Sequence, residues 1–110
     1  MRIYISGAVT GTDDAVERFE LWENLLKMYG WDVVNPQKIC SSFGHWEHQK
    51  IMKICFDLLA ECDAVCFMPG WEKSFGANQE YGYAYGTDMI ILTPKEVSDL
   101  SLKHPGGSSG

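Results

Sequence analysis

The residues from Pro69 to Glu80 gather groups that bind anions and groups that do acid–base or nucleophilic chemistry. An apolar run ends at Pro69 and a helical pattern follows, so the segment is predicted to connect a buried strand to a helix. Ser74 is placed to cap this helix, and Gly76 and Ala77 keep its first turn open to a ligand. Backbone N–H groups at a helix start favour a phosphate or carboxylate, so we expect an anion-binding turn.

Glu80 is the candidate catalytic residue of this segment. At about 100° per residue it lies roughly 60° from the helix face that carries Ala77 and Ala84, at the border of the buried stripe. We therefore expect its carboxylate to face the cleft. The places one turn away are Gly76 and Ala84, so no cation on the same helix pairs with it. Such a carboxylate either has a function or accepts hydrogen bonds from loop amides, and both interpretations stay open.

The loop after the first predicted strand is a second candidate site. Gly7 and Gly11 bracket a run of small residues that includes Thr10, and Ser6 precedes it. Glycines at such a place allow the backbone to approach a ligand closely, so the loop is a candidate for substrate binding. The spacing is not that of the dinucleotide-binding glycine motif, and an ordinary turn explains it equally well.

Alternating strand and helix patterns must position these loops. The patterns predict strands over 3–5, 31–34, 63–68 and 89–93, and helices over 15–29, 51–62, 74–86 and 94–102, with a loop over 37–45. This order indicates an α/β fold, a flavodoxin-like or Rossmann-like three-layer sandwich with a parallel sheet of four to five strands. We expect Tyr4, Val33, Val65 and Ile91 on adjacent strands, with helices on both faces.

Ligands of such folds bind outside the carboxyl ends of the strands, where the connections that follow two neighbouring strands run in opposite directions. This rule selects three loops, Ser6 to Thr12, Asn35 to Trp46 and Pro69 to Gly76. Trp46 and Trp71 would flank the cleft there. Each is suited to stack on a base, and each equally suits a subunit interface.

Length and composition set the class of the protein. The chain has 110 residues, which predicts one domain over 1–104 followed by a flexible tail or cloning remnant over 105–110. No apolar run reaches the roughly 20 residues of a membrane helix, and no secretory signal is visible, so we expect a cytoplasmic protein without membrane contact. The net charge is −6 with scattered basic residues, which argues against duplex nucleic acid as a partner but allows one small anion.

The four cysteines are interpreted as buried, reduced thiols. Cys40, Cys55, Cys62 and Cys66 contain no C-x-x-C pair, and the last three fall on apolar positions of a predicted helix and strand. Histidines at 45 and 48 precede Cys55, but the spacing matches no familiar zinc site. We therefore predict no metal and no cofactor.

Three segments together resemble the nucleoside 2-deoxyribosyltransferase-like superfamily. They are Tyr4 to Gly7, Asp63 to Val65 and, most specifically, Ser74 to Ala84. Members of that superfamily include base-exchanging transferases and 2'-deoxynucleoside 5'-phosphate N-hydrolases. The sequence from Pro69 to Ser74 is most similar to an uncharacterised branch from bacteria and phages. The resemblance covers about Arg2 to Pro94.

The resemblance implies a flavodoxin-like sheet and cleavage or transfer of the N-glycosidic bond of a 2'-deoxynucleoside or its 5'-monophosphate. Glu80 would attack C1' and form a covalent glycosyl-enzyme, and Tyr4 would hold the rotamer of that nucleophile. Ser74 and the Ser6 to Gly11 loop would receive the 5'-phosphate, with Gly76 beside them. The resemblance also implies a homodimer or higher homo-oligomer. Tyr4 as a core aromatic and Ser74 as a plain helix cap are equally compatible.

The sequence departs from the superfamily at one catalytic place. The resemblance puts an acid eight residues before Asp63, where this chain has Cys55. The nearest carboxylate, Asp57, is the candidate proton donor to the leaving base, although two residues along a helix turn it by about 200°. Three hypotheses follow: a deoxynucleotide N-glycosidase or transferase, a nucleotide-binding module without turnover, and a phage-type interaction protein on the same fold.

Overall fold

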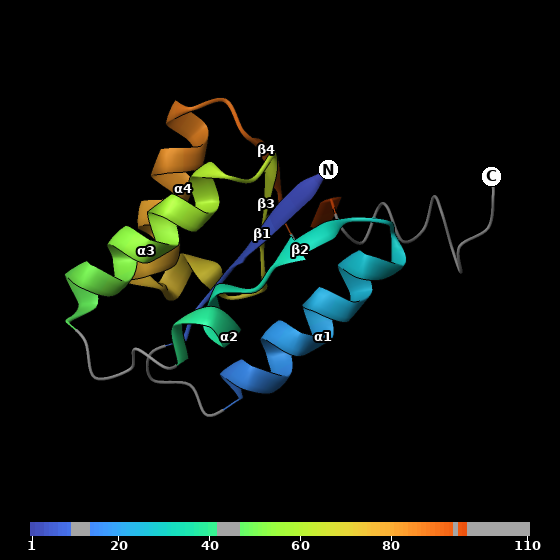
Figure 1. Cartoon of the computed structure of the whole chain (residues 1–110), viewed down its shortest axis with the longest axis horizontal. Helices are drawn as coiled ribbons and strands as arrows, with labels where there is room; N and C mark the ends of the chain where they lie inside the picture. Colours follow the sequence, from blue (N-terminus) through green and yellow to red (C-terminus); the bar gives the residue numbers. More distant parts are fainter. Residues whose placement is uncertain (10–13, 42–46, 94, 97–110) are drawn as a thin grey trace.

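Four parallel strands form a sheet at the centre of the computed structural model, which describes residues 1–9, 14–41, 47–93 and 95–96 (Figure 1). The strand order is β2-β1-β3-β4, and every neighbouring pair is parallel. Tyr4 pairs with Val34 and Val65, and Val65 pairs with Ile91, while Val33 pairs with Ile3. The predicted parallel α/β sheet is confirmed, and the fold is a flavodoxin-like three-layer sandwich.

The elements alternate along the chain as the sequence predicts, with one addition. They are β1 (Arg2–Ser6), α1 (Ala15–Met28), β2 (Asp32–Val34), α2 (Pro36–Cys40), α3 (His48–Ala60), β3 (Ala64–Phe67), the 3₁₀ turn η2 (Trp71–Lys73), α4 (Phe75–Gly86) and β4 (Ile90–Leu92). The helix predicted over 94–102 lies outside the described residues except for 95–96, which are helical. In the part of the chain that the structure describes, no helix is long and apolar enough to cross a membrane.

The pleat of β1 and β3 divides the core into two clusters, one on each face of the sheet. Ile3 and Ile5 face α1 and pack with Phe19 and Leu26. Tyr4, between them in sequence, points to the opposite face together with Val65 of β3. On that face α3 and α4 cover the sheet, as Figure 1 shows. All four residues of β3 are buried, as expected for a central strand that is covered on both faces.

The short helix α2 replaces part of the loop predicted over 37–45. Asn35 is its N-cap and accepts a hydrogen bond from the Lys38 N–H at 3.2 Å, and Pro36 occupies the first helical turn. An Asn-Pro pair fits a helix start as well as it fits a strand end, so the prediction was wrong here because it used only the second reading. The remaining residues of that loop, 42–46, lie outside the described part, and Trp46 is among them.

A buried carboxylate on α1 holds this helix start in place. Glu23 is 8% exposed, accepts a hydrogen bond from the Asn35 side-chain amide at 3.0 Å and pairs with Lys27 at 2.7 Å. Hydrogen bonds from Lys27 and Asn35 lower the pKa of the Glu23 carboxyl. The α1 helix therefore fixes the turn from β2 into α2.

We expect Asn35→Ala to lower the free energy of unfolding by about 1–3 kcal/mol, because it removes the α2 cap and leaves Glu23 without its amide donor. Urea unfolding followed by far-UV circular dichroism measures this change. The matched control is Asn24→Ala at an exposed α1 position, where the change should stay within about 0.5 kcal/mol. Equal effects of the two substitutions would show that the cap does not hold α2.

Candidate functional site

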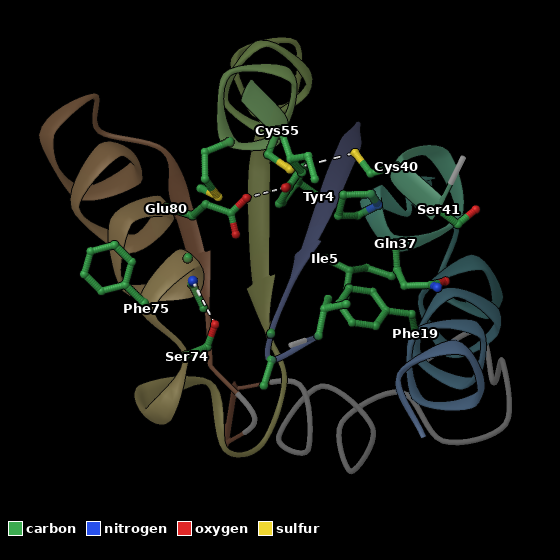
Figure 2. A pocket seen from close by; sticks show the side chains of 18 of the residues that line it. Tyr4, Ile5, Phe19, Gln37, Cys40, Ser41, Cys55, Ser74, Phe75 and Glu80 are labelled. Atoms are coloured by element: carbon green, nitrogen blue, oxygen red, sulfur yellow. Dashed lines mark hydrogen bonds between the residues drawn. The ribbon is translucent and has the colours of Figure 1, made fainter. Parts of the chain in front are cut away.

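A cavity of about 680 Å³ opens at the carboxyl ends of β1 and β3, where the chain leaves the two strands in opposite directions. Its walls come from the loop after β1, from α2 and α3, and from the start of α4 (Figure 2). A volume of this size holds a drug-sized or nucleotide-sized molecule. The predicted position of the cleft agrees with this geometry.

Glu80 lines this cavity from α4 and is only 5% exposed. Its carboxylate accepts a hydrogen bond from the Tyr4 hydroxyl and a second from the Ser6 hydroxyl at 2.7 Å. Figure 2 shows Glu80 turned toward Tyr4 across the end of the cavity. The register predicted for Glu80 is confirmed, and its partners are two hydroxyls of β1 rather than loop amides.

Burial dominates the electrostatics of this carboxyl. Loss of solvent raises the pKa of Glu80 to about 7, and the hydrogen bonds from Tyr4 and Ser6 oppose that rise. Burial and the neighbouring Glu80 raise the pKa of the Tyr4 phenol well above its usual range, so Tyr4 stays a hydrogen-bond donor. No ion pair to Glu80 occurs among the described residues. A carboxyl that titrates near neutral pH is suited to nucleophilic or acid–base chemistry.

The start of α4 forms another part of the wall. Ser74 is the N-cap and accepts a hydrogen bond from the Ala77 N–H at 3.1 Å, so its predicted capping role is confirmed. Gly76 lines the cavity beside it, and exposed Lys73 contributes the one cation among the described lining residues. This combination of a helix N-terminus and a lysine attracts an anion.

The structure brings some predicted residues to the cavity and leaves others away from it. Gly7 lines the cavity. Ser6 does not line the cavity itself, but its hydroxyl donates a hydrogen bond to Glu80, which does. Thr10 and Gly11 lie outside the described residues. Trp71 is not among the lining residues; it stacks on Tyr81 at 5.0 Å between ring centroids.

Asp57 is also away from the cavity, because it is an exposed residue of α3. Cys55, two residues earlier, lines the cavity instead, and burial raises the pKa of its thiol to about 12. All four cysteines are free thiols. No group of three or more His, Cys, Asp or Glu side chains suited to a metal ion occurs within the described ranges.

The segment Asn35 to Trp46, predicted to lie at the cleft, does contribute to the cavity wall, but the individual residues of α2, its C-cap and α3 that line the cavity were not predicted. These residues are Pro36, Gln37, Cys40, Ser41, Ile51 and Met52. Ile51 and Met52 lie in the helix predicted over 51–62, and recognition of Asn35-Pro36 as a helix start would have placed Pro36, Gln37 and Cys40 on a helix. Lys73 was also missed, since one lysine in a loop carries no signal by itself.

A family model matches residues 1–93 and carries the description Domain of unknown function (DUF4406). The chain belongs to this DUF4406 family. No curated protein and no solved structure matches the chain. Because the family description names no activity, the resemblance to the nucleoside 2-deoxyribosyltransferase-like superfamily stays a prediction.

The raised pKa of Glu80 predicts how stability depends on pH. A carboxyl whose folded pKa lies above its unfolded value contributes full stability below about pH 4.5, and loses it as the pH rises toward about 7. Glu80→Gln cannot ionise, so the stability of the variant relative to the wild type should increase as the pH rises through this window. Thermal unfolding from pH 4.5 to 8 measures the difference.

The matched control for this measurement is Glu72→Gln, at an exposed position of η2. Its melting temperature should follow that of the wild type at every pH. A constant difference between Glu80→Gln and the wild type across the whole range would contradict a raised pKa at Glu80.

Proposed function

We propose that this chain cleaves or transfers the N-glycosidic bond of a 2'-deoxynucleoside 5'-monophosphate through a covalent glycosyl-enzyme on Glu80. The observation that carries the proposal is a buried carboxylate in the cavity wall, held by two hydroxyl donors and by no cation among the described residues. Hydrogen bonds orient this carboxylate without neutralising its charge. A nucleophile that also stabilises an oxocarbenium-like transition state requires both properties.

In the proposed reaction, one oxygen of ionised Glu80 bonds to C1' while the C1'–N bond breaks and its electron pair leaves with the base. Tyr4 and Ser6 hold the carboxylate from the β1 side. Water then attacks C1' as the ester bond from C1' to Glu80 breaks, and the proton that the water loses passes through solvent to the departed base, which completes hydrolysis. In transfer, a nitrogen of a second base attacks C1' instead and loses its proton in the same way. The electron pair of the broken C1'–O bond stays with Glu80, so Glu80 regenerates as a carboxylate to which Tyr4 and Ser6 donate.

The start of α4 supports a phosphate at the other end of the substrate. Gly76 and Glu80 are four residues apart, about 6 Å along the helix axis, which is comparable with the span from C1' to the 5'-phosphate of a nucleotide. The helix N-terminus and Lys73 would hold the phosphate, with Gly7 and its neighbours on the opposite wall. A base would then lie toward α2 and α3.

Cys55 favours a second candidate function, a nucleotide-binding module without turnover. The departing base needs a proton or strong hydrogen bonds, and a thiol whose pKa is about 12 donates a proton poorly. Asp57 is exposed and does not line the cavity. The two functions share a binding site and differ in whether base is released.

Glu80→Gln should reduce release of base from deoxynucleotides by about 10³-fold, because the amide keeps the size of the side chain but cannot form the ester. Binding of the deoxynucleotide should survive. Chromatography of the released base over several deoxynucleotides measures turnover, and calorimetry measures binding. The exposed Glu72→Gln variant is the control and should retain wild-type turnover.

Equal release by the wild type and Glu80→Gln would refute the nucleophile. Binding by the wild type without any release would instead support the binding module, with Cys55 in place of the acid as its explanation.

A 5'-phosphate should strengthen binding by about tenfold or more over the corresponding deoxynucleoside, since the phosphate meets the α4 N-terminus and Lys73. Lys73→Met should weaken binding of the monophosphate and leave binding of the nucleoside unchanged. Lys50→Met, at an exposed α3 position outside the cavity, is the control. Equal affinity for nucleoside and monophosphate would favour an unphosphorylated substrate, as in the base-exchanging transferases.

A further inference from the structure

Two thiols from different helices meet at the end of the cavity where Tyr4 and Glu80 lie. Cys40 is the last residue of α2 and Cys55 lies on α3, and their sulfurs are 4.0 Å apart (Figure 2). Both side chains line the cavity. A disulfide has a sulfur separation of about 2.05 Å, so the two atoms need to approach by about 2 Å.

The other two cysteines lack such an arrangement. Cys62 donates a hydrogen bond to the Leu58 carbonyl, and Cys66 is fully buried in the cluster on the opposite face of the sheet. The pairing of Cys40 with Cys55 is therefore a feature of the cavity rather than of the cysteines in general. Cys40 is also half-buried rather than buried, which leaves its thiol the more accessible of the two.

We propose that Cys40 and Cys55 form a modification site, a thiol pair that small-molecule disulfides convert reversibly to an intramolecular disulfide. The inference goes beyond the proposed function and does not depend on it. The bond would tie the end of α2 to α3 across the cavity, beside the Tyr4–Glu80 hydrogen bond. Among the described residues, packing, the Asn35 cap and the Asn35–Glu23 hydrogen bond hold this wall of the site in the reduced protein, and oxidation would add a covalent link to α3.

The reaction proceeds by two exchange steps. The Cys40 thiolate attacks one sulfur of the small disulfide, so a mixed disulfide forms on Cys40 and one small thiolate leaves. Cys55 then gives up its proton and attacks the Cys40 sulfur, which forms the intramolecular bond and releases the second small thiol. Two protein thiols are oxidised and one small disulfide is reduced to two thiols, so atoms and electrons balance.

Burial slows these steps. It raises the pKa of both thiols, that of Cys55 to about 12, so little thiolate is present near neutral pH. The pair should therefore respond to sustained rather than brief oxidation. A mildly alkaline buffer suits the experiment for the same reason.

The test incubates the full chain with glutathione disulfide and follows the intact mass, followed by peptide mapping without reduction. We expect a transient adduct of about 305 Da, then a product about 2 Da lighter than the reduced chain with the Cys40 and Cys55 peptides linked. A reductant should restore the starting mass. The melting temperature of the oxidised chain should exceed that of the reduced chain by several degrees, because a crosslink restricts the unfolded state.

Cys40→Ser should abolish the lighter product, whereas Cys62→Ala should form it as the wild type does. Cys40 is the position to substitute, because it is half-buried and its loss disturbs the core less than loss of buried Cys55. A stable glutathione adduct, a disulfide between two chains, a link to Cys62 or Cys66, or an unmodified chain after prolonged incubation would each overturn the proposal.

Discussion

The hydrogen bonds from Tyr4 and Ser6 to the Glu80 carboxylate are the interaction on which the site depends. They join the central strand β1 to helix α4 and cross the face of the sheet at the cavity end. The pleat of β1 makes them possible, because residues two apart point to the same face while Ile3 and Ile5 pack on the other. One strand therefore supplies both an apolar core for α1 and a pair of hydroxyls for the carboxylate.

Burial of the Glu80 carboxylate lowers the stability of the fold, and this cost suggests that Glu80 serves a function. Burial of an ionised carboxyl is unfavourable, and two hydroxyl donors offset the cost only in part, since the pKa of Glu80 still rises to about 7. Glu23 offers a contrast within the same chain: its exposed fraction is also small, but loss of solvent affects its pKa less than its hydrogen bonds from Lys27 and Asn35 do, and its pKa is lowered. Glu23 fits a structural role, and Glu80 fits a site that needs reactive charge in a cavity.

Sequence patterns predicted the sheet, the two-sided helix cover, the capping role of Ser74 and the cleft-facing register of Glu80. Each of these follows from local periodicity or from a turn signal, which one sequence carries. The hydroxyl partners of Glu80 could not be derived from periodicity, because the pairing of β1 with α4 joins residues 76 positions apart. Helix α2, and with it the approach of Cys40 to Cys55, was not predicted because Asn35-Pro36 marks a strand end and a helix start alike.

Trp71 was expected at the cleft from its place in the loop, but its ring packs with those of Phe67 and Tyr81 in an aromatic cluster.

The proposed function requires that Glu80 forms a covalent bond to C1' of a deoxyribosyl group. The most direct measurement is the mass of the protein after incubation with a 2'-fluoro deoxynucleotide analogue, whose electron-withdrawing fluorine slows breakdown of the ester, followed by mapping of the modified peptide. We expect release of one base per chain and one sugar adduct on Glu80, and we expect no adduct on Glu80→Gln. An adduct on any other residue, or base release by the natural deoxynucleotide at an equal rate in Glu80→Gln, would contradict the proposed function.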